Sequence, residues 1–295
     1  MNKKSPIIAC HKEDIDGIVS AALILRIFPD AVIIFAKPND ITRMKAKFDI
    51  VCDLPKPKFC DVCIDHHMSN YQQLLESNKL SEKDLVDPNA SSAARLVAKY
   101  FNLNDEISRE LVEMADKADS GYFDEDLTTL DLLIKHNSND PAKLHWIAKK
   151  LAQNGRKIFD DPEFRMEAFK LRHLILKKDE IIKLVNSILE KGIKACIFDC
   201  RSLDPALGRI APTVFCRIGG KAAVSIYFDD VGNIKVSIRV DDTEFDAGKF
   251  ASLYGGGGHA KAAGVVFADE NSLAKFLSDF ISTFKEYSIA FLRIL

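Results

Sequence analysis

Residues 49–67 read DIVCDLPKPKFCDVCIDHH, and this stretch decides the fold class. It holds two short apolar runs, 49–53 and 61–65, and each run closes with an aspartate. Short apolar runs between turn residues predict buried strands. The runs at 6–10 and 31–36 have the same character. Because helical segments are interspersed with these strands, the pattern predicts an α/β domain with a largely parallel sheet flanked by helices.

The rest of the chain extends this plan to a second, smaller α/β domain. We expect helices at 17–28, 90–101, 106–117, 127–136 and 141–153. A long helical stretch at 163–191 is expected to connect the domains. Beyond it the pattern predicts strands at 194–199, 222–228 and 234–240, a hairpin turn at 229–233, and helices at 246–253 and 272–287. The predicted organisation is an N-terminal domain at 1–155, a helical connector at 156–191 and a C-terminal domain at 192–295.

Composition argues against several classes of protein. Apolar residues make up 47% and charged residues 28% of the chain, as expected for a folded, water-soluble protein. A net charge of -2 argues against binding to duplex DNA, although metal ions could still supply positive charge for a small phosphorylated substrate. No stretch is long and apolar enough to span a membrane, and no signal-peptide pattern is present, so we expect a cytoplasmic location. The seven cysteines are expected to be buried free thiols.

Residues 11–17, HKEDIDG, form the first candidate site. The segment follows a predicted strand and opens a predicted helix, so Asp14 and Asp16 lie where parallel sheets bind ligands. The two carboxylates could each hold a different metal ion. Amide groups at the start of the helix also favour anionic oxygens there. The alternative is that Asp16 merely caps the helix.

Three further segments carry acidic or histidine side chains near the same predicted sheet edge. Asp65, His66 and His67 end and follow one strand. Asp53 ends a second strand, and Asp119 precedes a Ser-Gly turn after a helix. Imidazole and carboxylate oxygen are good ligands for manganese, zinc or iron. Taken alone, the segment 65–67 could be a hydrogen-bonded loop cluster, Asp53 a turn residue and Asp119 a solvated helix end. Taken together, they predict a metal site.

Four consecutive glycines at 255–258 precede His259 in the second predicted domain. Such a run is costly in chain entropy, and it usually means that backbone approaches something closely or adopts positive φ. Exposed N–H groups there could bind phosphate, with His259 beside them. A flexible linker is the alternative, but apolar sequence lies on both sides and neither Ser nor Pro accompanies the run.

In this order, these features resemble the DHH phosphoesterase family, which is named for the triplet seen here as Asp65, His66 and His67. The run at 255–259 resembles the signature of the C-terminal domain that accompanies many members. The resemblance covers nearly the whole chain. It is greatest to the short-chain members that hydrolyse short oligoribonucleotides (nanoRNA) or 3′-phosphoadenosine 5′-phosphate.

The resemblance implies two divalent metal ions per chain, usually manganese. The ligands of one ion would be His11, Asp14 and Asp53. The ligands of the other would be Asp16, Asp53, His66 and Asp119, with Asp53 bridging the two ions.

The resemblance also implies substrate contacts. His67 would face the scissile phosphate and Arg239 would contact a substrate phosphate, so the expected catalytic residues are His67, Asp53 and Arg239. The far end of the substrate would be bound by Gly256, Gly257, Gly258 and His259.

The expected function is a two-metal phosphoesterase acting on short single-stranded oligonucleotides or small phosphorylated nucleotides. A cyclic dinucleotide phosphodiesterase or a pyrophosphatase is the alternative within enzymes. A non-catalytic nucleotide-binding regulator is the alternative from another class. We expect no membrane partner, and the sequence leaves open whether the chain is a homodimer.

Overall fold

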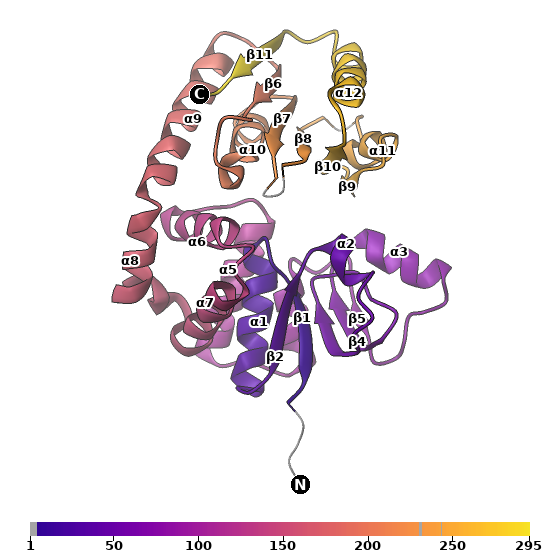
Figure 1. Ribbon diagram of the computed structural model, residues 1–295, viewed down its shortest axis with the longest axis vertical. Coiled ribbons are helices and arrows are strands. Elements are labelled where there is room, and N and C mark those ends of the chain that lie inside the picture. Colours follow the sequence, from indigo (N-terminus) through magenta and orange to yellow (C-terminus); the bar gives the residue numbers. More distant parts are fainter. Residues whose placement is uncertain (1–4, 230–231, 243) are drawn as a thin grey trace. The chain divides into compact units, whose positions relative to one another are not determined.

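The computed structural model describes residues 5–229, 232–242 and 244–295, and the chain folds as two compact units (Figure 1). The units are Met1–Leu171 and Arg172–Leu295. Their boundary falls inside the expected connector, whose long helical stretch is interrupted at the buried Leu171. The helix α8 (Pro162–Lys170) belongs to the first unit and α9 (Arg172–Glu190) to the second.

The first unit contains a five-stranded sheet in which every strand runs parallel to its neighbours. The strands are β1 (Ile7–His11), β2 (Val32–Ala36), β3 (Phe48–Cys52), β4 (Cys60–Asp65) and β5 (Leu85–Val86), and their order is β2-β1-β3-β4-β5. All strands begin at one edge of the sheet and end at the other, so the residues that follow them gather at one edge. The parallel sheet with its flanking helices confirms the predicted α/β class.

The helix α1 (Ile15–Ile27) is the central helix of the first unit. Every residue from Ile15 to Leu25 is buried, because apolar or small residues occupy nearly all sides of the helix. It packs against β1 and mainly against the helices α4 (Ala93–Tyr100), α5 (Glu106–Asp119) and α7 (Pro141–Asn154) (Figure 1). This burial fixes the start of α1 beside the carboxyl ends of the strands.

Some short elements of the first unit have weak sequence signals. They are α2 (Pro38–Ile41), α3 (Met68–Glu76), β5 and the 3₁₀ helix η1 (Gly155–Asp160). In α3 only Asn70 and Leu74 are buried, so the helix has almost no apolar stripe for a periodicity argument to detect. The remaining helix, α6 (Glu125–His136), lies where the sequence predicts it.

The second unit contains a mixed six-stranded sheet. Its strands are β6 (Ala195–Asp199), β7 (Ala222–Phe228), β8 (Ile234–Val240), β9 (Gly257–His259), β10 (Ala262–Phe267) and β11 (Ile289–Arg293). The order is β11-β6-β7-β8-β10-β9; the first three are parallel to one another, and β7, β8, β10 and β9 are antiparallel. The predicted hairpin turn includes residues 230 and 231, which lie outside the described residues, but the antiparallel pairing of β7 with β8 is present.

Helices cover both faces of this sheet. The faces are formed by alternate residues of each strand. One face, with Ile197, Val224 and Ile238, packs against α11 (Ala247–Ser252) and α12 (Glu270–Thr283). The other face is contacted by α10 (Ile210–Arg217), which follows the short 3₁₀ helix η2 (Pro205–Leu207). Among the described residues, no helix has both the length and the apolar character needed to cross a membrane.

Candidate metal centre

The candidate site of the first unit lies at the carboxyl ends of three neighbouring strands. His11 is the last residue of β1, Asp53 follows β3 and Asp65 is the last residue of β4. Strand register explains why they meet, because Cys10 pairs with Cys52 and Cys52 pairs with Ile64. The residues that follow these partners therefore emerge side by side, where ligands bind in parallel sheets.

The start of α1 brings two aspartates to the same edge. Asp14 is the N-cap of α1, and its Oδ1 accepts a hydrogen bond of 3.1 Å from the Gly17 amide. The two carboxylate oxygens of the buried Asp16 accept bonds of 2.7 and 2.8 Å from the Ala93 and Ala94 amides at the start of α4. The helix cap is therefore Asp14, and Asp16 is held by a different helix. A Cβ on Gly17 would lie 2.3 Å from the His11 carbonyl oxygen, so glycine lets α1 begin directly behind His11.

Asp53 occupies the centre of the site. Only 3% of its surface is exposed, and its backbone adopts φ of 56°, a left-handed conformation that Asp tolerates better than most residues. Its Oδ2 lies 3.4 Å from His11 Nδ1, and its Oδ1 lies 3.6 Å from His67 Nδ1. Oδ2 is buried and accepts no hydrogen bond from the described residues. A buried oxygen without a donor suits a cation, so this carboxylate fits a position between two metal ions.

His66 is oriented with one ring nitrogen toward the carboxylates. Its Nδ1 faces the Ala90 carbonyl oxygen at 3.3 Å, a contact that requires the proton on Nδ1. Its Nε2 faces Asp119 Oδ2 at 3.0 Å and Asp16 Oδ2 at 3.6 Å. Metal-binding histidines commonly donate their other nitrogen to a carbonyl in this way. Asp119 is the last residue of α5, so the end of this helix brings its carboxylate to the site.

Asp65 orients its neighbours. Its carboxylate is not among the described ligand atoms that lie close enough together to hold a metal ion. Its Oδ1 lies 2.8 Å from His67 Nδ1 and accepts a 2.8 Å bond from the His66 amide. Its Oδ2 accepts a 2.7 Å bond from Asn70 Nδ2. Asp65 therefore fixes the ring of His67, and Asn70 fixes Asp65. The sequence gives no signal for Asn70, because the helix α3 that carries it has almost no apolar stripe.

The structure brings all of the expected ligands of the first unit together. The possible ligands form three groups, and within each group the ligand atoms all lie within 4.8 Å of one another. The groups are His11, Asp14 and Asp53; Asp16, His66 and Asp119; and Asp53, His66 and His67. Asp53 and His66 each belong to two groups, so the groups form one cluster. The mixture of carboxylate oxygens and imidazole nitrogens fits manganese, iron or zinc.

The charges of this cluster are unfavourable without cations. Burial and the charge of Asp119 raise the pKa of Asp16 to about 8, and burial with the charges of Asp14 and Asp16 raises the pKa of Asp53 well above its usual range. Although burial opposes protonation of His66, its carboxylate partners raise its pKa to about 9. Without cations the cluster thus retains protons that divalent ions would displace, which is a second respect in which the site fits metal ions.

The second unit contains the residues expected to contact substrate. Arg239 lies on β8 opposite Ala262 of β10, and Ala262 lies opposite His259 of β9. Arg239 and His259 therefore share one row and one face of the sheet. Arg239 donates to Ser237 Oγ at 3.0 Å and to the Ile238 carbonyl oxygen at 2.8 Å, which fixes the guanidinium. Burial and the nearby charge of Arg209 lower the pKa of Arg239 to about 10, so it stays protonated near neutral pH.

The glycine run lies partly in β9 and pairs with β10, so it is not a flexible linker. A Cβ on Gly256 would lie 2.2 Å from the Gly264 carbonyl oxygen. Gly258 has φ of 146°, and its Cβ would lie 2.4 Å from the Ala262 carbonyl oxygen. The space around a Cβ on Gly257 is open to 4 Å among the described residues. The packing of the unit itself therefore explains Gly256 and Gly258, while Gly257 remains free to face a ligand.

A family model matches residues 193–286, and it describes a DHHA1 domain. The chain carries a DHHA1 domain. The match spans the second sheet from β6 through α12, including Arg239 and the glycine run. A search of curated proteins gave no match.

Two solved structures share the fold across both units. PggH from Vibrio cholerae, a pGpG-specific phosphodiesterase, is 19% identical, covers 96% of this chain and 100% of its own, and has a TM-score of 0.64. An exopolyphosphatase-related protein from Bacteroides fragilis is 14% identical, covers 95% of this chain and 92% of its own, and has a TM-score of 0.55. Together with the DHHA1 domain, this fold supports a phosphoesterase of the DHH family and confirms the resemblance seen in the sequence.

Within the DHHA1 domain, sequence reasoning missed Arg209 as a neighbour of Arg239. Arg209 precedes α10 directly, and its charge acts on Arg239. Gly208 brings this segment onto the face of the sheet that carries Arg239, because a Cβ there would lie 2.4 Å from the ring of Tyr227 on β7. The only sequence signal was a basic residue at the start of an unpredicted helix.

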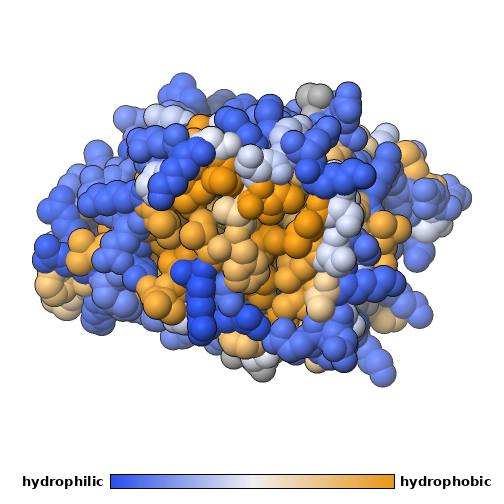
Figure 2. Space-filling model, turned by 90° about the horizontal axis from the view of Figure 1, so that it is seen from above, coloured by the Kyte–Doolittle hydropathy of each residue, from blue (hydrophilic) through white to orange (hydrophobic). Residues whose placement is uncertain are grey.

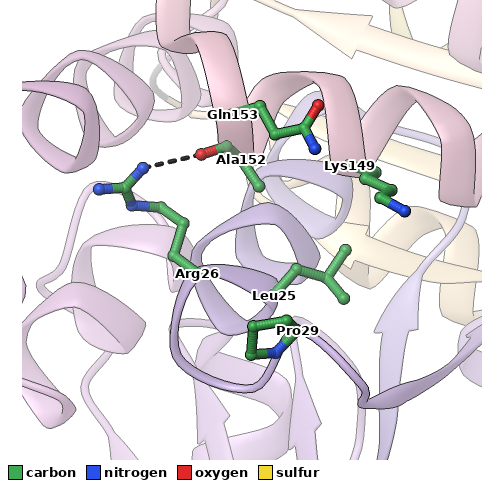
Figure 3. Close-up of a pocket in the computed structure, with 6 residues that line it drawn as sticks. All are labelled: Leu25, Arg26, Pro29, Lys149, Ala152 and Gln153. Atoms are coloured by element: carbon green, nitrogen blue, oxygen red, sulfur yellow. Dashed lines mark hydrogen bonds between the residues drawn. The ribbon is translucent and has the colours of Figure 1, made fainter.

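A pocket on the first unit lies away from this cluster (Figure 3). It measures about 330 Å³ and is lined by Leu25, Arg26, Pro29, Lys149, Ala152 and Gln153. Arg26 Nη1 donates a 2.7 Å bond to the Ala152 carbonyl oxygen beside it. Arg26 lies at the opposite end of α1 from Asp16, roughly 15 Å along a helix that rises about 1.5 Å per residue. None of its lining residues is an expected site residue.

Proposed function

We propose that the chain is a metal-dependent phosphodiesterase that hydrolyses short linear oligonucleotides, with nanoRNA and 5′-phosphorylated dinucleotides as the favoured class. The observation that carries this proposal is the cluster in which Asp53 and His66 each join two groups of ligand atoms. Such a cluster suits a pair of divalent ions, and manganese, the metal that the family resemblance implies, is one of those that its mixed donor set fits.

When bound, a pair of divalent cations lowers the pKa of a shared water and offsets charge on the phosphate oxygens. The protein supplies the geometry. Asp53 offers one oxygen toward His11 and the other toward His67, and it therefore spans both halves of the site. Asp16 is held by two helix amides, so its oxygens keep their positions as the charge in the site changes.

His67 is the residue placed to handle a proton. Burial opposes its protonation, but Asp65 on its Nδ1 raises its pKa, which favours the imidazolium. With Nδ1 bound to Asp65, the ring can offer Nε2–H to a phosphate oxygen or to the leaving oxygen. Asn70 on the far oxygen of Asp65 keeps that carboxylate, and so the ring, in one orientation.

The DHHA1 domain supports an oligonucleotide over a simple phosphate ester. Arg239 and Arg209 place two positive charges near each other on one face of its sheet, an arrangement that binds a phosphate group well. These charges suit a substrate that carries a phosphate group besides the one that is hydrolysed, as a short oligonucleotide does and a simple phosphate ester does not. The related PggH, which is specific for pGpG, supports this size class.

The test is a hydrolysis panel with manganese. It would contain pGpG, ribo-oligonucleotides of two to ten residues labelled at either end, 3′-phosphoadenosine 5′-phosphate, a cyclic dinucleotide and pyrophosphate. We expect turnover of the short linear members, and none with the Asp53→Asn variant, which controls for contaminating nucleases. Turnover restricted to pyrophosphate or the cyclic dinucleotide would replace the proposal with that activity. Tight binding of nucleotide without turnover under any divalent metal would point to a regulator.

A further inference from the structure

The possible metal ligands of the described residues gather in the first unit. Figure 2 looks onto the second unit and shows an apolar area bordered by hydrophilic side chains there. One ligand group of the first unit, Asp16, His66 and Asp119, lies beside residues 90–94, ASSAA, which include the start of α4. This segment has no carboxylate or imidazole of its own, and what it offers the group is hydrogen bonds.

Two of the three ligands are held directly by this segment. The Ala90 carbonyl oxygen lies 3.3 Å from His66 Nδ1, while the other ring nitrogen faces the carboxylates. The amides of Ala93 and Ala94 donate bonds of 2.7 and 2.8 Å to the two oxygens of Asp16. Hydrogen bonds of this kind orient metal ligands from behind. The segment therefore sets the positions of two ligands relative to each other.

The third ligand, Asp119, has no direct support of this kind. It is the last residue of α5, and helix ends fray. Among the described residues, the polar partner within bonding distance of its carboxylate is His66 Nε2, at 3.0 Å. One turn earlier on the same face of α5, Asp116 Oδ1 accepts a 2.7 Å bond from Ser92 Oγ. This bond ties α5, and with it Asp119, to the segment that holds the other two ligands.

Ser92 differs from the other residues that cap helices in the described chain. It is the N-cap of α4, and its Oγ accepts a 3.1 Å bond from the Arg95 amide. At every other described helix whose N-cap side chain accepts a bond, the cap is an aspartate. An ionised carboxylate can only accept hydrogen bonds, whereas a hydroxyl also donates one. The fully buried Ser92 uses that donor on Asp116, so it does more than begin its helix.

We infer that Ser92 is a positioning residue for one metal ion of the pair, and that it acts through Asp116. The bond between them sets the distance from Asp119 to the other two ligands of its group. The inference rests on the metal-dependent function proposed above. The group that contains His11 makes no hydrogen bond to residues 90–94 in the described structure, so Ser92 should leave an ion there unaffected.

The test measures manganese binding to the metal-free full chain by isothermal titration calorimetry, with no substrate present. Wild type should bind two ions. Ser92→Ala should weaken one of them about 10–100-fold, the usual effect of removing a hydrogen bond behind a metal ligand, and leave the other at its wild-type affinity. Asp116→Ala should do the same. Asp116→Asn keeps an acceptor for Ser92, so it should bind both ions as wild type does.

Ser108→Ala is the matched control for stability. Ser108 is a fully buried serine near the other end of α5, and its Oγ donates a 2.6 Å bond to Asp105. Its replacement should lower the melting temperature and leave both manganese affinities unchanged. Two unaltered affinities in both Ser92→Ala and Asp116→Ala overturn the inference, and so does an equal loss at both ions.

A double-mutant cycle tests whether Ser92 acts through Asp119. Asp119→Asn should weaken the same ion, and adding Ser92→Ala should then weaken it little further, because the group being positioned is already impaired. With Asp14→Asn, a change at the other ion, the effect of Ser92→Ala should be undiminished. Full additivity of Ser92→Ala with Asp119→Asn overturns the inference.

Turnover of pGpG by the same proteins separates this inference from the proposed function. A wild type that binds two manganese ions but hydrolyses no nucleotide would refute the function, while the effect of Ser92→Ala on one ion would still support its positioning role. Turnover by wild type, with unaltered affinities in Ser92→Ala and Asp116→Ala, would refute the positioning role alone. A wild type that binds no manganese would refute both.

Discussion

Replacing Asp53 with Asn separates the function of the metal centre from its stability. Asn has the same shape, and it tolerates the left-handed backbone of φ 56°, so the fold should be kept. The amide nitrogen must replace either Oδ1 on the His67 side or Oδ2 on the His11 side. Because an NH₂ group cannot bind a cation, one half of the site loses its ligand whichever way the amide turns.

The expected effects have opposite signs. Loss of the shared ligand should lower metal content from two ions per chain to one or fewer and lower the rate at least a thousandfold, or about 4 kcal/mol at 1.36 kcal/mol per tenfold. In the metal-free protein, the change removes a buried carboxyl group whose pKa is raised by burial and by the charges of Asp14 and Asp16. A neutral amide of the same shape avoids the cost of protonating this carboxyl group, which is about 1.36 kcal/mol for each unit by which its pKa is raised. The melting temperature without metal should therefore rise by several degrees.

The assay combines elemental analysis, turnover of pGpG with manganese, and thermal unfolding with and without a chelator. Asp61→Asn is the matched control, because Asp61 is an exposed aspartate on the neighbouring strand whose partner is Lys47 at the surface. It should leave all three measurements at wild-type values. A folded Asp53→Asn protein with two tightly bound ions and full turnover would refute the shared-ligand reasoning. A lower melting temperature in the chelated protein would refute the electrostatic part alone.

Three further outcomes are expected. First, thermal melts of the chelated protein should show a loss of stability as pH rises from about 5 to 9. The folded state holds protons with a pKa of about 8 on Asp16 and about 9 on His66, whereas unfolding restores the ordinary pKa values. Saturating manganese should abolish this pH dependence, and a gain of stability with rising pH would contradict the prediction. Second, Asn70→Ala frees the carboxylate that orients His67, and should lower turnover about 10–100-fold with metal content unchanged; a coupled loss of metal would show a structural role instead. Third, Gly256→Ala should lower the melting temperature of the DHHA1 domain, because the added Cβ would lie 2.2 Å from a carbonyl oxygen. Gly257→Ala should melt like wild type and alter only substrate binding, since the space around its Cβ is open. Equal melting curves for the two variants would contradict this difference.

The elements that the sequence predicts well are those with one dominant local signal. The helix α1 is apolar on nearly every side, and β3 and β4 are apolar runs that close with acidic residues, so their type and approximate ends follow from residue pattern. Parallel pairing then gathers the strand ends, which explains why residue pattern predicts that the acidic and histidine side chains after these strands lie together. The structure adds that Asp14 caps its helix while Asp16 binds α4, a difference that depends on a contact 77 residues apart in the chain.

Other parts of the molecule depend on tertiary contacts that leave little trace in sequence. Asn70 lies on α3, whose nearly polar sequence gives no periodic signal. The strand β9 is two glycines and a histidine, and it exists because β10 supplies its hydrogen bonds. The place of β11 at the end of the second sheet depends on parallel pairing with β6, which begins 94 residues earlier in the chain. Local propensity cannot specify such pairings, since partner strands decide them.

The candidate metal centre is also where the described part of the chain departs from what a stable fold requires. Asp53 combines positive φ, near-complete burial and an oxygen without a donor, and burial raises its pKa along with that of Asp16. Each feature costs free energy in the metal-free protein, and the surrounding helices and strands hold them in place. A hydrogen-bonded loop cluster would not need this arrangement, because neutral side chains could close the same space without burying like charges. The cost is understandable if cations offset the charges, which is why metal-dependent stability is as informative about this site as turnover.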